Sequence, residues 1–410
     1  MSVLSSTEVL RSGPKGFKRL VTQAVMGAMP FGFRLLRGLK PIPRFGKTYV
    51  VTRYDDVREV FATDPAFGVP YKDKLDVIMG GEPFFLGMGD TAQYRADTAA
   101  MRKVVRPDDL PALAAKVEAQ AEAIVAGAGG RIEVVDALVR RVTFDFLAEY
   151  FGVPAPPGGD LRVWGTRLFE YQFVASDAPL LGEVAQIAPA LRDHIQHEIE
   201  RRRAKPGKAD DVLARCLALQ KAGEPGFSDA QIRTALMGFI VGGPPQPPMV
   251  VPQAMEQLLR RPDALRGAQA AARAGDDALL AGYVREAMRF DPLAPGLPRI
   301  VLKDWTVAQG TKRQRTIPAG ATVLAAFASA MRDGRRVPDP ETFDPRRLPH
   351  EYIHFGYGLH QCFGIHINNA TLHLMLKPLL RRDNLRRAPG AAGRLRKNGA
   401  FAEALTVEFD

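Results

Sequence analysis

Apolar residues recur at helical spacing along most of the chain, and shorter runs alternate as strands do. Between residues 94 and 292 they return every three or four positions, in stretches that proline and glycine separate. We therefore expect helices over 55–63, 94–105, 110–125, 136–151, 161–174, 183–203, 210–220 and 276–292. Short β-branched and apolar runs predict strands over 48–53, 306–307, 316–317 and 322–326.

One apolar stretch, residues 228–260, begins as a helix and cannot continue as one. Ser228 suits the N-cap position, and Ile232, Leu236 and Phe239 follow at helical spacing. Five prolines then fall within nine residues: Pro244, Pro245, Pro247, Pro248 and Pro252. Because an interior proline costs a helix about 3 kcal/mol, we expect this helix to break.

Composition places the chain among ordinary globular proteins. Of its 410 residues, 46% are apolar and 25% are charged. No apolar run reaches the roughly 18 residues that span a bilayer, and the N-terminus lacks the apolar core and cleavage site of a secretory signal. Cys216 and Cys362 are the only cysteines. A disulfide framework is thereby excluded, and we expect a cytoplasmic location.

The formal charge of +11 is unevenly distributed. Residues 9–54 contain ten Lys or Arg and no Asp or Glu, and large apolar residues are interleaved with them. Such an N-terminal arm either lies in solvent or makes peripheral contact with an anionic membrane surface. The high pI is not accompanied by a nucleic-acid-binding motif, so we expect no nucleic-acid partner.

The stretch 355–364, Phe-Gly-Tyr-Gly-Leu-His-Gln-Cys-Phe-Gly, combines one cysteine with a glycine-rich turn at the start of an apolar helix. Backbone N–H groups and the helix N-terminus can face the sulfur of Cys362, which favours thiolate over thiol. The glycines permit the close approach that a flat macrocycle stacked on the turn would need. His360 could then reach an anionic group at the edge of that macrocycle.

This F-G-x-G-x-H-x-C-x-G pattern resembles the haem-binding loop of cytochrome P-450 proteins, in which the cysteine thiolate is the proximal ligand of haem iron. The resemblance covers the chain from about residue 45 onward. It implies an α+β fold, mainly α with small β-sheets, in which haem b lies between distal and proximal helices. It also implies one catalytic domain over 45–410, preceded by the basic arm at 1–44. The residues that it assigns to the haem are Cys362 as iron ligand and, around the cofactor, His360, Arg299, Arg102, Phe355, Gly356 and Gly364.

Two further motifs carry the resemblance. Glu286 and Arg289 lie three apart on one helix face and match the family's structural E-x-x-R ion pair. Thr342 stands where the family usually has an arginine that joins this pair, so we expect Arg346 or Arg347 to take its place.

The two expected contacts to haem propionates come from arginines. Arg299 occupies a position that usually binds a propionate, for which a guanidinium is well suited. Arg102 matches the second such arginine, whereas Thr98 replaces the His or Trp usually found four residues before it.

The distal helix departs from the family. Monooxygenase members read roughly A-G-x-[D/E]-T where this chain has Gly242, Gly243, Pro244, Pro245 and Gln246. The acid and the threonine normally organise water and deliver protons. Proline has no proton to give, although the amide of Gln246 can still donate and accept hydrogen bonds.

Three functions remain open. The first is a peroxygenase or hydroperoxide isomerase, which takes its oxygen already activated and uses Gln246, Gly243 and Cys362 as its catalytic residues. The second is a monooxygenase driven by NAD(P)H through a ferredoxin, with protons supplied by water or substrate. The third is a haem-binding protein without turnover. Either enzyme would act on an apolar substrate, a class that includes lipids.

A second basic set follows the cysteine helix and comprises Lys377, Arg381, Arg382, Arg386 and Arg387. The resemblance places the docking of an acidic ferredoxin or flavodoxin at this end of the helix, where electrostatic steering would favour association.

Overall fold

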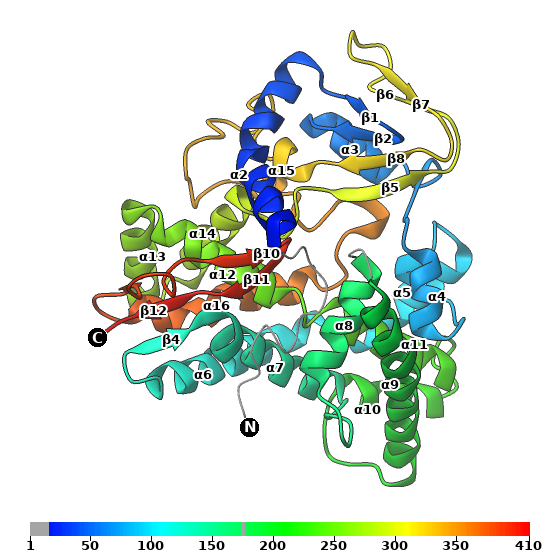
Figure 1. The fold of residues 1–410 in the computed structure, drawn as a ribbon. Helices are drawn as coiled ribbons and strands as arrows, with labels where there is room; N and C mark the ends of the chain where they lie inside the picture. Colours follow the sequence, from blue (N-terminus) through cyan, green and yellow to red (C-terminus); the bar gives the residue numbers. More distant parts are fainter. Residues whose placement is uncertain (1–15, 174–176) are drawn as a thin grey trace.

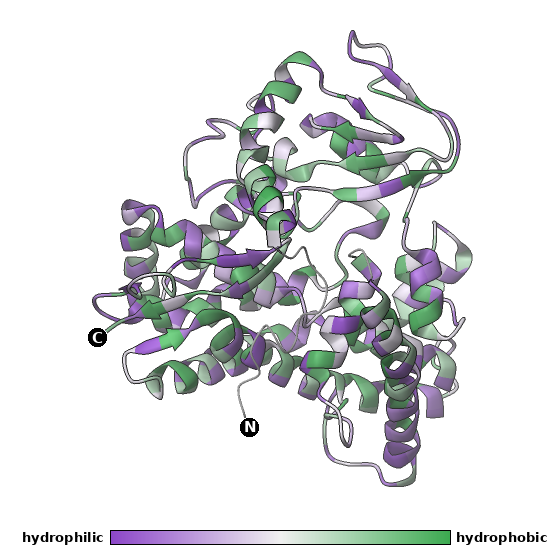
Figure 2. Cartoon of the chain, in the orientation of Figure 1, coloured by the Kyte–Doolittle hydropathy of each residue, from purple (hydrophilic) through white to green (hydrophobic). Residues whose placement is uncertain are grey.

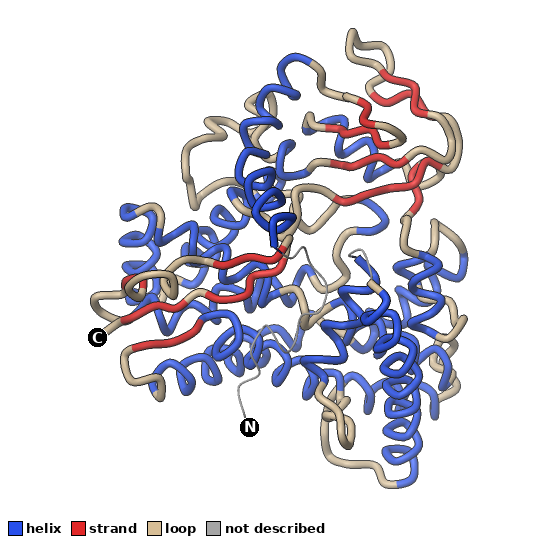
Figure 3. Tube along the Cα trace, viewed as in Figure 1, coloured by secondary structure: helices blue, strands red, loops and turns tan. Residues whose placement is uncertain are grey.

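The computed structural model describes residues 16–173 and 177–410. Most of the strands gather in the upper part of Figure 1, and helices fill the lower part; Figure 3 separates the two by colour. The mainly helical fold with small sheets that the sequence predicts is confirmed.

The upper part is built on a five-stranded sheet with the order β1-β2-β8-β5-β3. Its strands are β1 (Arg44–Phe45), β2 (Thr48–Val51), β8 (Thr322–Ala325), β5 (Leu297–Val301) and β3 (Phe67–Gly68). Strands β2 and β8 run parallel, and the other neighbours are antiparallel. Beside the sheet are α2 (Gly16–Leu39), α3 (Tyr54–Ala62), α15 (Phe327–Ala330) and the hairpin of β6 (Trp305–Val307) and β7 (Arg315–Ile317).

The lower part consists of helices that share one hydrophobic core. They are α4 (Lys72–Met79), α5 (Ala92–Val104), α6 (Leu110–Ala126), α7 (Arg141–Phe151), α8 (Leu161–Phe173), α9 (Ala178–Ala204), α10 (Val212–Lys221), α11 (Asp229–Gly242), α12 (Pro247–Leu259), α13 (Pro262–Ala274), α14 (Asp277–Phe290) and α16 (Ile365–Arg381). Two small sheets border them, formed by β4 (Arg131–Glu133), β12 (Thr406–Glu408) and β9 (Arg386–Arg387), and by β10 (Arg396–Asn398) and β11 (Phe401–Ala404).

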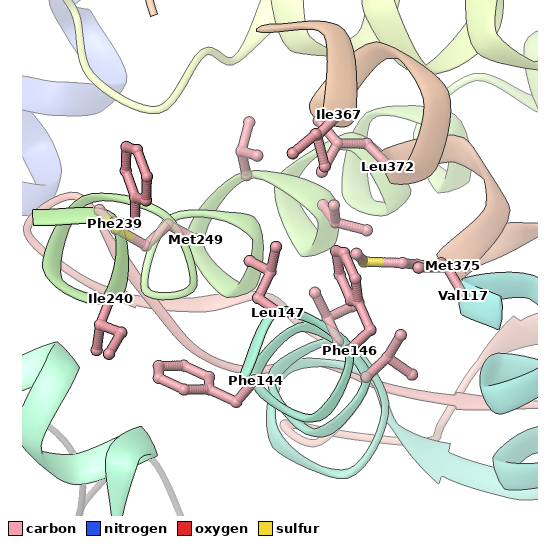
Figure 4. Close-up of a cluster of buried hydrophobic side chains, with 14 of the residues drawn as sticks. Val117, Phe144, Phe146, Leu147, Phe239, Ile240, Met249, Ile367, Leu372 and Met375 are labelled. Carbon is pink, nitrogen blue, oxygen red and sulfur yellow. The ribbon is translucent and has the colours of Figure 1, made fainter. Parts of the chain in front are cut away.

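Side chains from separate helices meet in the core of this lower part. Figure 4 shows Phe146 of α7 beside Met375 of α16, and Leu147 of α7 between this pair and Met249 of α12. All four are at most 5% exposed. Because burial of a large apolar side chain stabilises a fold by about 1.5–3 kcal/mol, this cluster fixes α16 against α7 and α12. The cysteine loop, which precedes α16, is held in place by the same packing.

Local capping explains why several predicted helices begin where they do. Thr91 accepts a hydrogen bond from the N–H of Tyr94 at the start of α5, and Ser228 forms a capping box with Gln231 at the start of α11. The helices predicted over 110–125, 161–174 and 276–292 are confirmed as α6, α8 and α14, within two residues at each end. Helix α9 begins five residues earlier than expected, at the N-cap Asp177, and α13 was not predicted.

The predicted break in the distal helix is confirmed. Helix α11 ends at Gly242 and α12 begins at Pro247, so residues 243–246 are outside both helices. Two of the five prolines occupy the first two positions of α12, where their missing N–H groups cost nothing. The proline-rich run therefore separates the end of α11 from the start of α12.

The basic arm contains α2, and part of this helix packs on the β-rich part. Phe33 is buried with Val50 and Ala326, and the guanidinium of Arg37 donates to the backbone oxygen of Ser329 at 3.1 Å. The predicted domain boundary at residue 44 stays a prediction. In the described part of the chain, no helix combines the length and the apolar character needed to cross a bilayer.

Candidate functional site

The cysteine loop, residues 355–364, is closed by its own backbone. The N–H of Cys362 donates to the carbonyl oxygen of Phe355 at 2.9 Å. Gly356 and Gly358 have φ angles of 76° and 72°, which side-chain-bearing residues rarely adopt. At Gly358 a Cβ would also lie 2.7 Å from the carbonyl oxygen of Phe61. The glycines at 356 and 358 are therefore required by the turn itself.

The sulfur of Cys362 lies three residues before α16. The N–H of Gly364 and the side-chain amide of Asn368 both donate toward it, the latter at 3.8 Å. Burial nevertheless prevails and raises the pKa of the Cys362 thiol to about 11. The prediction that the loop alone favours thiolate is therefore wrong, because two weak hydrogen bonds do not offset the loss of water. A metal ion would remove the proton on binding.

Arg299, on β5, is a buried cation without an acidic partner. It is 3% exposed, lies 5.1 Å from the ring of Phe61 and donates to the carbonyl oxygen of Pro298 at 3.0 Å. Within residues 16–173 and 177–410, no ion pair includes it. Burial lowers the pKa of Arg299. A buried guanidinium of this kind is suited to an anionic group that the chain does not supply.

His360 lies beside Arg299 and Asp64. Its Nε2 atom is 3.2 Å from Oδ1 of Asp64. Burial and the positive charge of Arg299 lower the pKa of His360. The lowered pKa favours the neutral ring, which has one N–H to donate. Asp64 is one acceptor beside it. Asp64 comes from the segment directly after α3, and no motif in that segment indicates its place here.

Arg102 and Thr98, on α5, face the other side of the cysteine loop. They line a cavity of about 230 Å³ together with Leu359, Gln361 and Phe363. The guanidinium of Arg102 is 4.8 Å from the ring centre of Phe363. The hydroxyl of Thr98 donates to the backbone of its own helix. The structure thus brings Arg102 to the loop and leaves Thr98 as a small residue in the cavity wall.

The predicted ion pair on α14 is confirmed, and Arg347 joins it. Glu286 and Arg289 are fully buried and are connected by two hydrogen bonds of 2.7 Å. Nε of Arg347 donates to Glu286 at 3.1 Å. Thr342 contributes its backbone oxygen, which accepts from both arginines. Arg347 therefore supplies the charge that the threonine cannot, and this network supports the segment leading to the cysteine loop.

Aromatic rings connect the distal helix to the cysteine loop. Phe239 of α11 stacks on Phe363 with a centroid distance of 5.4 Å, and Phe85 lies 5.3 Å from Phe363. Phe85 is 2% exposed. Phe85, in the segment between β3 and α5, therefore packs directly on the loop.

Gly243 and Gln246 are in the break between α11 and α12. The N–H of Gly243 donates to the carbonyl oxygen of Phe239 at 2.9 Å, and a Cβ on Gly243 would be 2.8 Å from that oxygen. The side-chain amide of Gln246 donates to the carbonyl oxygen of Gly242. Both residues thus close the end of α11, and the amide nitrogen of Gln246 is already engaged.

The second basic set does not form a free positive surface. Lys377 is buried between Glu118 and Asp277, at 2.9 and 2.7 Å. The other four members are paired as well: Arg381 with Glu118, Arg382 with Glu122, Arg386 with Glu408 and Asp410, and Arg387 with Glu256. Acids from other segments therefore pair with all five members, and the prediction that this set steers an acidic partner stays a prediction.

These residues fit a haem group. The described residues contain no cluster of three or more His, Cys, Asp or Glu side chains that could hold a metal. Arg299 acts on His360 and Arg102 lies over Phe363, so both guanidinium groups are next to the cysteine loop and are suited to the carboxylates of a haem. Phe239 and Phe363 touch, so a macrocycle between α11 and the loop requires these rings to turn aside. Sequence reasoning missed Asn368, whose place near the start of α16 was the available signal.

Known proteins resemble this chain in sequence and in fold. The family described as Cytochrome P450 matches residues 172–399. Cytochrome P450 monooxygenase PikC of Streptomyces venezuelae is 25% identical over 348 residues, which are 83% of this chain and 79% of that protein. The ligand-free structure of cytochrome P450 TbtJ1 superposes with a TM-score of 0.77 at 25% identity and covers 94% of this chain and 98% of that one.

A fungal protein matches a shorter stretch more closely. A bifunctional dioxygenase–epoxy alcohol synthase of Pyricularia oryzae is 40% identical over 121 residues, which are 30% of this chain and 10% of that protein. With the family match, the resemblance to PikC and TbtJ1 over most of the chain, and the cysteine loop in place, the chain belongs to the cytochrome P450 family and is an oxidoreductase of that type.

Proposed function

We propose that this protein is a monooxygenase, which uses dioxygen and electrons from a small redox protein to oxidise an apolar substrate. The observation that carries the proposal is its agreement over 83% of the chain with a bacterial P450 monooxygenase. This agreement favours the monooxygenase driven by NAD(P)H through a ferredoxin. It disfavours the peroxide-driven enzyme that the sequence also left open.

The proposed cofactor is haem b, held by Cys362 as iron ligand. Arg299 and Arg102 would bind its two carboxylates by charge-assisted hydrogen bonds. Phe355, Gly356 and Gly364 would frame the sulfur, and His360 would stand at the cofactor edge. The bound group would supply the iron that activates oxygen, with the thiolate donating electron density.

The break between α11 and α12 would shape the distal side of the pocket and would not supply a general acid. Pro244 and Pro245 are buried in the break and have no proton to transfer. Gln246, one of whose N–H groups is bound to Gly242, would present its carbonyl oxygen and its second N–H, and so could order water without acting as an acid. Protons would then arrive through water or from the substrate itself.

An apolar substrate is supported by a second group of aromatic rings. Phe173 at the end of α8 lies 5.0 Å from Tyr71 and 4.8 Å from Phe169, and Phe169 lies 6.1 Å from Phe401 of β11. Three segments far apart in the sequence thus present rings to one another. Phe173 remains 40% exposed, so an apolar molecule could bury it further.

A second candidate, chemistry on a hydroperoxide, has its own support. The acid and threonine of monooxygenases are replaced by Pro245 and Gln246, and the local match is to an epoxy alcohol synthase coupled to a dioxygenase. An epoxy alcohol has two added oxygen atoms, as does a hydroperoxide. Conversion of one into the other therefore balances without an oxidant, a reductant or a proton relay.

Two reaction mixtures separate these candidates. One contains the haem-loaded protein, ferredoxin, ferredoxin reductase, NADPH and air, with palmitate and testosterone as apolar probes. The other is anaerobic and contains only ferric protein and linoleate hydroperoxide. We expect oxidised product in the first and slow conversion in the second. Rapid anaerobic conversion to epoxy alcohol or diol, with no product in air, would contradict the monooxygenase proposal.

The remaining predictions from the sequence are retained as part of this proposal. The redox partner would be a ferredoxin or flavodoxin, and its predicted docking site is the set after α16, whose charges pair with acids of the chain. The cytoplasmic location stays a prediction. Cys216, the other cysteine, is buried and free.

A further inference from the structure

Helix α2 has two apolar stripes, and only one of them packs on the protein. The inward stripe follows helical spacing and includes Met26, Met29, Phe33 and Leu36. It is anchored where Arg37 donates to Ser329, and Gln23 donates to the backbone of Lys397 at 3.2 Å. Because this face is fixed to the body, the opposite face of α2 must point outward.

The outward stripe is large and apolar, contrary to what a surface helix requires. Seven side chains line it and are 45–84% exposed: Phe17, Leu20, Val21, Val25, Phe31, Leu35 and Leu39. They fall on one side of a helix of 24 residues, about 36 Å long, with one step of six positions from Val25 to Phe31. A helix that served only to cover the core would have polar residues here. Figure 2 shows the recurring green segments of α2 at the edge of the fold.

This concentration of exposed apolar side chains has no equal elsewhere in the described residues. Thirteen large apolar side chains are exposed, and eight of them are in residues 17–45, the eighth being Phe45 in the hairpin of β1 and β2. Isolated exposed apolar residues are normal, whereas a continuous stripe marks an interaction surface.

Positive charge accompanies the stripe and is not neutralised. Lys18 and Arg34 are exposed on α2, Lys40 is exposed directly after it, and Arg44 and Lys47 are exposed beside Phe45. In the described part of the chain, none of these five is in an ion pair. Residues 9–54 contain no acid. The arm thus differs from the set after α16, where every charge meets a carboxylate.

We propose that α2 and the adjoining hairpin are a docking surface for an anionic lipid bilayer. The apolar stripe would enter the boundary between headgroups and acyl chains, with the flanking lysines and arginines against the phosphates. A second copy of the chain is a poorer occupant, since it would bring the same positive flanks against this face. The surface would hold the protein beside apolar molecules dissolved in the membrane.

The test uses the full-length, haem-loaded protein and vesicle sedimentation. Vesicles of phosphatidylcholine are compared with vesicles that also contain about one-quarter phosphatidylglycerol, at low and high salt. The variant Phe31→Ser with Leu35→Ser removes two stripe residues that are 66% and 46% exposed. The matched control, Leu302→Ser with Leu348→Ser, changes two residues that are 56% and 58% exposed away from the arm.

We expect the wild type and the control to sediment with the phosphatidylglycerol vesicles, more strongly at low salt. The stripe variant should lose roughly tenfold or more in partitioning, with its haem spectrum and circular dichroism unchanged. Equal sedimentation of wild type and stripe variant would overturn the proposal. So would failure of the wild type to bind vesicles, including the case in which it instead forms a dimer that Phe31→Ser with Leu35→Ser abolishes.

Discussion

The two sides of the proposed haem pocket are built on different physical principles. On the cysteine side, buried charges and backbone hydrogen bonds fix the loop: Glu286, Arg289 and Arg347 form one network, and the glycine turn closes on itself. On the opposite side, the helix is cut between Gly242 and Pro247, and short-range hydrogen bonds such as those of Gly243 and Gln246 close its ends without any buried ion pair among them. The cysteine loop and its supporting network can therefore match the family motifs, while the residues between Gly242 and Pro247 differ from them.

The largest effect should come from Cys362 itself. Cys362→Ala removes the one sulfur that faces the loop, so the reduced protein should lose its thiolate-type carbon monoxide spectrum entirely. Cys216→Ala is the control, because Cys216 is buried in α10 and should leave the spectrum intact. A thiolate spectrum surviving in Cys362→Ala would refute the assignment of the cysteine side.

Breaking the buried network should cost more than breaking any surface pair. Glu286→Ala leaves two arginines without their carboxylate, and we expect a loss of about 3–5 kcal/mol in the free energy of unfolding, measured by urea denaturation. Asp263→Ala is the control, since Asp263 and Arg266 have the same three-residue spacing but are exposed to water. A similar small effect in both variants would mean that the cysteine side is not held by this network.

Replacing Arg299 tests whether its buried charge binds a carboxylate of the haem. Arg299→Gln should speed haem transfer to excess apomyoglobin by about tenfold to a hundredfold, the value of one or two charge-assisted hydrogen bonds. Arg315→Gln, at an exposed position on β7, should have no effect. Unchanged transfer from Arg299→Gln would remove that residue from the haem site.

Acid should lower the free energy of unfolding by protonating His373, on the cysteine side. Burial lowers the pKa of this α16 residue from 6.5 to about 4, so the unfolded chain takes up a proton before the folded one does. Stability should therefore fall as the pH drops from about 6.5 to about 4 and level off below, with about 1–2 kcal/mol lost between pH 7 and pH 5. His373→Gln should flatten this dependence in urea denaturation. An unchanged slope would assign the acid sensitivity to other groups.

The smallest effect is expected on the distal side. Gln246→Leu loses one hydrogen bond to Gly242, worth about 1 kcal/mol, and should leave both the thiolate spectrum and turnover in air nearly unchanged. A large fall in anaerobic hydroperoxide conversion, with stability preserved, would instead give Gln246 a direct role and strengthen the second candidate function.

Local features could be predicted from the sequence, and long-range ones could not. The cysteine loop, the pair on α14 and the break after Gly242 each depend on residues within one short segment. The neutralisation of Lys377 depends on Glu118 and Asp277, which come from other helices. Likewise, the pKa of Cys362 depends on how completely the fold excludes water.

The most direct test of the account is to follow the origin of oxygen in the product. The full-length protein is supplied with ferredoxin, its reductase, NADPH, an apolar substrate and isotopically labelled dioxygen. A monooxygenase with a conventional cysteine side predicts one labelled oxygen atom per product and a strict need for the reductant. Unlabelled product, formed without reductant from a hydroperoxide, would contradict the account and show that the broken distal helix defines a different reaction.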